Sequence, residues 1–520
     1  MGASLFLEPR LEPPLRELLD SAGLLHTLVD ALGSPLNVLL PDVVAGNVAA
    51  FRAVYRRHRL AGRICFAHKA NRSSALVRRL AATEAGLDAA SLAELSHALG
   101  SGFAPERVVA TGPKDPDFLW LAARAGVTVH IDAPAELADL VRLVRAHGLP
   151  RARVLLRLAG FASEGVRLLT RRTRFGTPVD AVGGLLDLLE RERDAVELLG
   201  AAYHLDTTGL AEKALALESC VLVLDEARRR GLAPRVVDIG GGYGTSYLAE
   251  AEQWERYTTE LTHAVLGRRP PLTWGGHGYG LRNEGGTVRG RLTLYPAHRP
   301  VAGPGYLDEL LATPAPTLGR TLADVLLEHL YDLWVEPGRA LVDQCGLSLA
   351  RVVDVRVAEG GAPLVRLAMT AGDVSLEEHG VLTDPVLVPR AGRGAGGAGG
   401  GAPVGVHLVG DLCLEADLIT RRLVFLPRLP DRGDLLAFAN TAGYCMDFRA
   451  HHAQMRPGAR KVAAGRRADG SWWWSLDERY WPTTRTSDEG TGGEAPGRDG
   501  TGREAPGAEA MSGEAMSGEA

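Results

Sequence analysis

The sequence predicts an α/β fold that consists of a (β/α)8 barrel, a C-terminal antiparallel β domain and a disordered C-terminal tail. From Leu36 to about residue 340, short apolar runs alternate with amphipathic helical segments, which is the pattern of a parallel sheet covered by helices. After Glu336, strand-like runs follow one another without helices between them, which indicates an antiparallel domain. From about Thr483 the chain is rich in Gly, Glu, Ala, Ser and Pro and cannot bury a core.

Each expected element follows from its local hydrophobic period. A helical pattern covers residues 15–32, and Asp132 is the expected N-cap of a helix over 133–147. The expected barrel strands are 36–40, 64–67, 108–111, 127–131, 154–158, 198–205 and 236–239. The helices expected between and after them are 43–58, 74–80, one that begins at 93, 117–125, 133–147, 179–191, 212–230 and 322–332. The later strands are expected at 348–357, 363–368, 404–409 and 435–439.

These patterns also predict domain bounds. Residues 268–316 are rich in Gly, Pro, aromatic residues and Arg, which predicts an insertion or lid-like loop, with a disordered surface loop as the alternative. Residues 393–401 form a glycine-alanine linker. The expected division is 1–35 as a segment joining the β domain, 36–332 as the barrel, 333–482 as the β domain and 483–520 as the tail.

Composition excludes several classes of protein. The formal net charge of −5 over 520 residues, with arginines spread rather than clustered, gives no reason to expect nucleic acid or a membrane surface as a partner. No apolar run approaches the ~18 residues of a spanning helix, and the proline-broken start does not fit a signal peptide. The five cysteines are widely spaced and odd in number, which favours a reducing cytoplasm over a zinc site or a disulfide framework.

One lysine stands out. The apolar run Ile64–Ala67 predicts a buried strand that ends just before Lys69. The sequence contains only four lysines, and arginine supplies nearly all other cations. Lysine, unlike arginine, loses its proton when desolvated and then attacks carbonyl groups. The alternative is an ordinary solvated lysine at a strand end.

Other strand ends carry groups that complement an amine. They are Asp88, His204, the run Gly240, Gly241 and Gly242, and the pair Glu336 and Arg339. Consecutive glycines expose backbone N–H groups that enclose a phosphate, although a plain tight turn explains them equally well. A lone histidine is more often structural, but the carboxyl end of a barrel strand favours function. An amine, a phosphate cradle, a flat ring and an acid together predict pyridoxal 5′-phosphate (PLP).

The same residues carry a family resemblance from about residue 35 to 455. The chain resembles the PLP-dependent decarboxylases of the ornithine, diaminopimelate and arginine group, which have an alanine-racemase-like fold, and its layout is most similar to diaminopimelate decarboxylase. The motifs occur in the family's order: Phe66-Ala-His-Lys69-Ala-Asn71, Gly86-Leu-Asp88-Ala-Ala-Ser91 with Glu94, His204, Asp238-Ile-Gly-Gly-Gly242, Glu336-Pro-Gly-Arg339, Gly410-Asp-Leu-Cys413 and Gly433-Asp434 with Tyr444.

The resemblance implies a role for each residue and decarboxylation through a Schiff base and a quinonoid intermediate. Lys69 forms the Schiff base, His204 stacks on the ring near Asp88, and Glu336 bonds the pyridine nitrogen. The phosphate is surrounded by Gly240, Gly241, Gly242, Thr207, Arg339 and Tyr444. Cys413, supplied by the partner subunit of a homodimer, returns a proton to Cα. The alternatives are a buried apolar cysteine at 413 and a packed, solvent-tipped tyrosine at 444.

The residues expected to touch the substrate depart from the family. Leu414 stands where the family has an acid, so the candidate substrate residues are Glu415 and Asp417. Residues 371–379 lack the arginine and tyrosine that grip a distal carboxylate in diaminopimelate-type members. We therefore expect a decarboxylase of an unusual amino acid whose pocket is shaped by residues 268–316. Two alternatives are a racemase or epimerase on the same barrel and an inactive regulatory protein of this fold.

Overall fold

The computed structural model describes residues 5–161, 173–356, 361–390, 403–446, 448–449 and 453–482. The expected linker at 393–401 and the expected tail at 483–520 lie outside these residues. Within the described ranges, no helix combines the length and the apolar character needed to cross a membrane.

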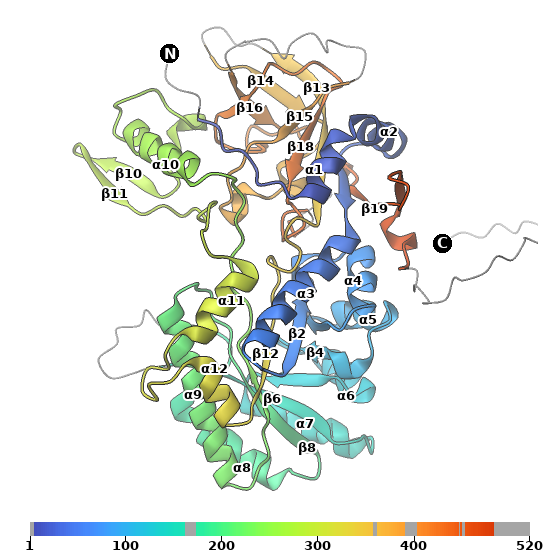
Figure 1. The fold of residues 1–520 in the computed structure, drawn as a ribbon, viewed down its shortest axis with the longest axis vertical. Coiled ribbons are helices and arrows are strands. Elements are labelled where there is room, and N and C mark those ends of the chain that lie inside the picture. The colour runs from blue at the N-terminus through green and yellow to red at the C-terminus, as the bar shows by residue number, and fades with distance from the viewer. Residues whose placement is uncertain are drawn as a thin grey trace, which may run out of the picture. The chain divides into compact units, whose positions relative to one another are not determined.

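In the described part of the chain, eight parallel strands close into a barrel surrounded by helices (Figure 1). The last strand pairs back with the first, which closes the ring. The order around the ring is β2 (Gly62–Ala67), β3 (Gly86–Ala89), β4 (Val108–Ala110), β5 (Thr128–Ile131), β6 (Ala152–Ala159), β8 (Val196–Ala202), β9 (Val236–Asp238) and β12 (Asp332–Val335). A short β7 (Thr177–Pro178) adds to the end of β6. The predicted α/β barrel is confirmed.

The covering helices begin where the sequence offers caps. Ser73, Ser91 and Asp115 accept the third backbone N–H of α4, α5 and α6. Asp132 does not cap α7, whose N-cap is Ala133; its carboxylate instead accepts the Gly176 N–H. The barrel helices are α3 (Pro41–Arg57), α4 (Ser74–Ala81), α5 (Leu92–Gly100), α6 (Pro116–Ala125), α7 (Pro134–Ala146), α8 (Gly183–Arg191), α9 (Leu210–Arg229), α11 (Gly303–Ala312) and α12 (Leu322–Glu328).

The second sheet contains a strand that the sequence pattern placed in the barrel. β1 (Leu36–Leu39) lies between β13 (Gly346–Arg356), to which it is antiparallel, and β19 (Arg460–Arg466), to which it is parallel. All four β1 residues are buried, and a short fully apolar run does not indicate which sheet it will join. The barrel therefore begins at β2, and β12 closes it.

The remaining strands complete a mainly antiparallel domain. The sheet runs in the order β17 (Val424–Leu426), β16 (Val404–Val409), β14 (Leu364–Leu367), β13, β1, β19 and β20 (Trp472–Leu476), with β18 (Leu435–Ala439) and β15 (Val386–Val388) added beside β13. The N-terminal helices α1 (Pro13–Asp20) and α2 (Ala22–Leu32) pack their leucines against β1, β13 and β19.

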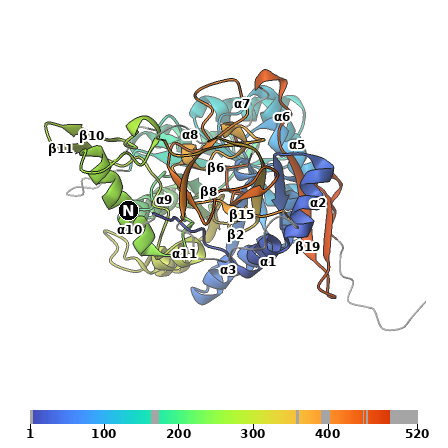
Figure 2. The same cartoon turned by 90° about the horizontal axis from the view of Figure 1, so that it is seen from above.

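The segment that interrupts the barrel rhythm packs against this second domain. It contains a β10–β11 hairpin (Leu281–Glu284 and Thr287–Gly290) beside α10 (Ala251–Val265), and the hairpin projects outward in both views (Figure 2). Leu272, Tyr279 and Ala297 share a buried cluster with residues of β13, β14, β16 and β18. The Trp274 N–H donates to the Arg421 carbonyl at 2.7 Å. These contacts hold the segment against the β domain, so it is not a loose surface loop.

Candidate active site

The carboxyl ends of the barrel strands open into a cavity of about 770 Å³. Parallel barrels bring the ends of distant strands together at this face. The cavity is lined by most of the predicted residues: Lys69, Asp88, His204, Thr207, Gly241, Gly242, Glu336, Arg339 and Tyr444. Gly240 lies directly behind, since a Cβ on it would be 2.9 Å from Nδ1 of His204.

Lys69 projects into this cavity from a 3-10 turn that follows β2. The turn is held on both sides, because Ala67 N–H donates to the Pro337 carbonyl at 3.3 Å and Tyr444 N–H donates to the Ala70 carbonyl at 2.8 Å. Burial alone lowers the pKa of the Lys69 amine, but Asp88 and the other acidic groups outweigh it and raise the pKa above its ordinary value. The Lys69 side chain is therefore a protonated amine exposed to the cavity.

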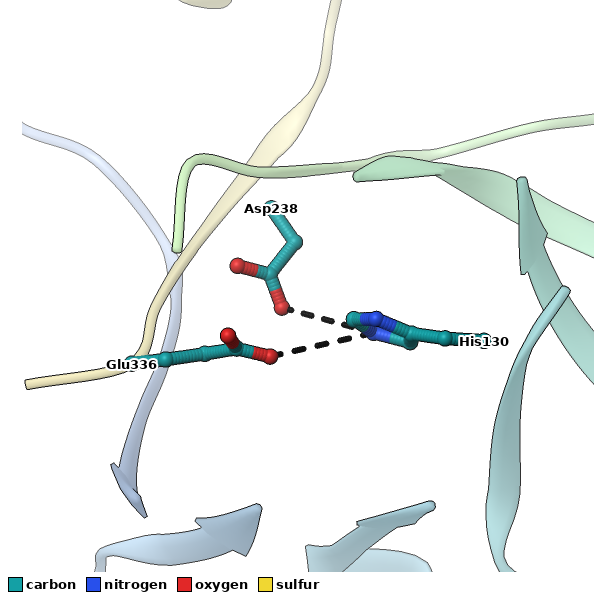
Figure 3. Close-up of side chains that lie close together, drawn as sticks. All are labelled: His130, Asp238 and Glu336. Carbon is teal, nitrogen blue, oxygen red and sulfur yellow. Dashed lines mark ion pairs between the residues drawn. The ribbon is translucent and has the colours of Figure 1, made fainter. Parts of the chain in front are cut away.

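A buried acid pair lies beside this turn, at the ends of β12, which pairs with β2, and of β9, which pairs with β12. Glu336 and Asp238 are 6% and 0% exposed, and His130 Nε2 lies 3.9 and 3.7 Å from their carboxylate oxygens (Figure 3). Burial and mutual repulsion raise the pKa of Glu336 well above its ordinary value, and burial also raises that of Asp238. Two such carboxyl groups hold a shared proton.

His130 was not predicted by the sequence analysis. It is an isolated residue in the buried strand β5, without a motif around it. Burial lowers its pKa well below the usual value, so the ring is neutral. Among the described residues, Nε2 of His130, Oδ2 of Asp238 and Oε1 of Glu336 have no hydrogen-bond partner. These three atoms lie close enough together to bind one metal ion, and of the three residues Glu336 lines the cavity.

The glycine run forms a cradle that side chains would fill. Gly240 and Gly242 have φ of +62° and +87°, which favour glycine. A Cβ on Gly240 would lie 2.6 Å from the Tyr203 carbonyl oxygen, and a Cβ on Gly242 would lie 3.1 Å from that of Thr207. The glycines thus let the loop after β9 pack closely against the loop after β8, and Gly241 and Gly242 line the cavity there.

A buried amine lies under the cradle. Lys213, on α9, is 0% exposed and donates to the carbonyl oxygens of Gly241 at 2.6 Å and Gly242 at 3.1 Å. Burial lowers its pKa to about 7. No motif marked Lys213, because its role depends on the packing of α9 behind the β9 loop. The only signal in the sequence was the rarity of lysine.

Arg339 and His204 complete the barrel side of the cavity. Arg339 donates to the Tyr247 hydroxyl, and its guanidinium lies 5.3 Å from the centre of the Tyr444 ring. The surrounding cavity walls and the nearby Lys69 lower the pKa of His204, whose ring is exposed to the cavity, so its imidazole is neutral at ordinary pH. A neutral ring at this place is suited to stacking on a flat cofactor.

The other wall of the cavity comes from outside the barrel. Tyr295 and Arg299 belong to the interrupting segment, and His379 and Phe448 belong to the β domain. Tyr295 N–H donates to the Gly380 carbonyl at 2.9 Å, and its hydroxyl accepts the Thr245 N–H at 2.7 Å. Sequence analysis missed these residues because they lie in irregular segments without a recognisable spacing.

Three predicted residues do not line the cavity of the single chain. Cys413 and Glu415 are exposed, so the alternative of a buried apolar cysteine is wrong. Asp417 is 7% exposed, and its carboxylate accepts the backbone N–H groups of Ala371 and Leu412, each at 2.8 Å. Because these bonds use both of its oxygens to hold the loop, a substrate contact by Asp417 has no support within one chain.

The barrel and this set of side chains define a class of protein, the PLP-dependent amino-acid decarboxylases with a (β/α)8 barrel. Residues 46–278 match the family model described as pyridoxal-dependent decarboxylase, pyridoxal binding domain. The chain is 31% identical over 464 residues to the uncharacterized protein y4yA of Sinorhizobium fredii, a match that covers 87% of this chain and 92% of that protein. The chain therefore belongs to the PLP-dependent decarboxylase family, and its cofactor is PLP.

Relatives with a named activity match a shorter part of the chain. Amino acid decarboxylase lolD1 of Epichloe uncinata is 30% identical over 230 residues, or 42% of this chain and 53% of that protein. Diaminopimelate decarboxylase of Deinococcus radiodurans is 30% identical over 244 residues, or 45% and 59%. The chain thus spans little more than half the length of these two relatives.

Solved structures share the fold. The diaminopimelate decarboxylase of M. jannaschii in complex with L-lysine superposes with a TM-score of 0.65 at 17% identity, covering 87% of this chain and 91% of that one. The arginine decarboxylase of Paramecium bursaria Chlorella virus bound to agmatine superposes with a TM-score of 0.60 at 18% identity, covering 85% and 100%. At this identity they show the barrel and β domain, not the substrate.

The residues present fit PLP. A lysine amine projects into the cavity, and a cradle closed to any Cβ lies beside it. Across the described ranges, Oδ1 of Asp88 and Oε1 of Glu336 are buried and have no hydrogen-bond partner, as expected where a polar ligand supplies one.

Proposed function

We propose that this chain removes the α-carboxylate of an amino acid and releases the amine. The proposal is carried by one observation, the convergence at a single cavity of the Lys69 amine, the buried Glu336 carboxyl group and the Gly241–Gly242 backbone. An electron-accepting cofactor needs an anchor, a phosphate site and an acid for its ring nitrogen, and these residues offer all three.

Each residue has one task in this proposal. When bound, PLP supplies a conjugated ring that accepts the electron pair left behind by the departing carboxylate. Lys69 would hold the cofactor covalently through Nζ until the substrate amine takes that place. Glu336, whose pKa is raised by burial beside Asp238, would share its proton with the ring nitrogen. The His204 ring would lie against one face of the cofactor and exclude water from it.

The phosphate and the product are handled at opposite sides of the cavity. Thr207, Arg339, Tyr444 and the glycine backbone would hold the phosphate. In this proposal Cys413 acts in the cavity of a second copy of the chain, where its thiol returns a proton to Cα and Glu415 lies near the substrate. Exposure of Cys413 in the single chain supports this arrangement, because a partner is able to reach it.

The test is incubation of the PLP-loaded protein with a panel of amino acids while CO₂ and amine are measured. CO₂ release that is lost in Lys69→Ala is the expected result, together with pyridoxyl attachment at Lys69 after borohydride reduction. Exchange of the α-hydrogen without CO₂ would favour a racemase or epimerase. PLP binding without either reaction would favour an inactive protein of this fold.

The choice of substrate is proposed to depend on the segment that interrupts the barrel, since Tyr295 and Arg299 line the cavity. Deletion of residues 272–300 is a poor test, because Leu272, Tyr279 and Ala297 belong to a buried cluster shared with the β domain. Point substitutions at the cavity wall keep that cluster intact.

A further inference from the structure

Arg299 is a cation in the cavity that the cofactor site does not account for. Within the part of the chain that the structure describes, its Nε is buried without a hydrogen-bond partner, and its one side-chain hydrogen bond, to the Thr208 hydroxyl, is long at 3.4 Å. Among the described residues no carboxylate forms an ion pair with it. Arg299 also borders a smaller cavity, but the acid that lines it, Asp343, is paired with Arg10. A buried guanidinium nitrogen without an acceptor indicates a missing anionic ligand.

The position of Arg299 is fixed before any ligand arrives. Its backbone N–H donates to the Ser246 hydroxyl at 3.1 Å, and its guanidinium stacks 4.5 Å from the centre of the Tyr295 ring. Tyr295 is itself held between Thr245 and Gly380. A cation held in this way loses little conformational freedom on binding, which favours recognition over incidental contact.

The cofactor phosphate has its own ligands. Gly241, Gly242, Thr207 and Arg339 surround the cradle at the end of β9. Arg299 contacts later residues of the same two loops, Thr208 in the loop after β8 and Gly244 in the loop after β9. A Cβ on Gly244 would be 3.1 Å from the Arg299 Cδ. This geometry leaves a second cation beside the phosphate site, at the wall that faces the substrate.

We propose that Arg299 binds an anionic group at the end of the substrate's side chain, so that the substrate is an α-amino acid with a distal carboxylate or similar acid. This inference rests on the proposed decarboxylase function and names its substrate class. The α-carboxylate is not the partner, because a cation held on the group that leaves as CO₂ would stabilise the ground state and slow the reaction.

A matched pair of ligands tests the proposal. L-2-Aminoadipate ends in a carboxylate and L-lysine ends in an amine, with similar length, and each is titrated into the PLP-loaded protein by following the cofactor absorbance. We expect the wild-type protein to bind 2-aminoadipate more tightly than lysine. Arg299→Met is expected to lower the affinity for 2-aminoadipate by about 10-fold without changing the affinity for lysine. Glutarate is expected to compete with 2-aminoadipate in wild type only.

Two controls distinguish binding of the substrate's distal acid from binding of the cofactor phosphate. Arg289→Met removes an exposed arginine of the same segment and is expected to leave all titrations unchanged. The affinities of the apo protein for PLP and for pyridoxal, which lacks the phosphate, measure phosphate binding separately. Arg299→Met is expected to leave the ratio of these two affinities unchanged. A fall in PLP affinity with unchanged amino-acid preference would make Arg299 a phosphate ligand and overturn the proposal.

Other outcomes also decide the matter. Tighter binding of lysine by wild type, or no saturable response to 2-aminoadipate, would contradict recognition of a distal acid. The titration measures binding alone, so failure of the proposed function, seen as absence of CO₂ with every amino acid, is distinguishable from failure of the Arg299 proposal.

Discussion

The amine of Lys213 lies 2.6 Å from the carbonyl oxygen of Gly241 and is shielded from solvent. It holds the glycine cradle from behind, on the side opposite the cavity. Burial lowers its pKa to about 7, so the amine is only partly charged near neutral pH. A phosphate bound in the cradle would favour its charged form.

Replacing Lys213 with Met is expected to weaken PLP binding on the order of 10-fold. The variant removes charge-assisted hydrogen bonds to Gly241 and Gly242, each worth about 1.5–3 kcal/mol, and leaves the cradle carbonyls without a donor. Spectrophotometric titration of the apo protein measures the affinity, with pyridoxal as the ligand that lacks the phosphate. Equal losses for PLP and pyridoxal would mean that Lys213 supports the fold rather than the phosphate site.

The same lysine predicts a pH dependence of stability in the apo protein. The pKa of Lys213 falls from its ordinary 10.5 to about 7 in the folded state, so between these values the folded chain binds fewer protons than the unfolded chain. Stability from this group therefore rises with pH across that window, by up to about 4 kcal/mol, and its cost is largest below pH 7. Urea unfolding of wild type and Lys213→Met at pH 7 and pH 10 measures the difference. Parallel pH profiles would contradict the assignment.

The sequence alone was enough to predict a site residue where a local hydrophobic pattern and a chemically reactive side chain occurred together. Lys69 and Glu336 each follow an apolar strand, so the predicted barrel places both at the carboxyl ends of its strands. The strand at Leu36–Leu39 was assigned to the wrong sheet because its four buried residues suit either sheet. His130 and Arg299 were missed because their partners come from distant parts of the chain, and no spacing along the sequence encodes such contacts.

A buried ion pair fastens the β domain to the N-terminal segment and gives a stability prediction. Arg422 and Asp384 are 1% and 5% exposed and form an ion pair, and Asp384 also accepts the Leu7 N–H at 2.7 Å. Arg422→Met leaves a buried carboxylate without its cation, which is expected to cost about 3–5 kcal/mol in urea unfolding. Arg421→Met, which breaks a half-exposed pair with Glu377, is expected to cost about 1 kcal/mol or less. Equal effects of the two substitutions would refute the buried-pair account.

Cys413 gives the prediction that depends on a second chain. If its thiol acts in a partner's cavity, Lys69→Ala and Cys413→Ala are each defective, but their mixed dimer contains one site with both residues intact. After equal amounts are mixed and allowed to exchange, half of the dimers are mixed, so about a quarter of wild-type activity is expected to return. Sedimentation of each variant checks that dimers form. Mixing without recovery, in samples shown to exchange subunits, would place Cys413 in its own chain's site or outside the reaction.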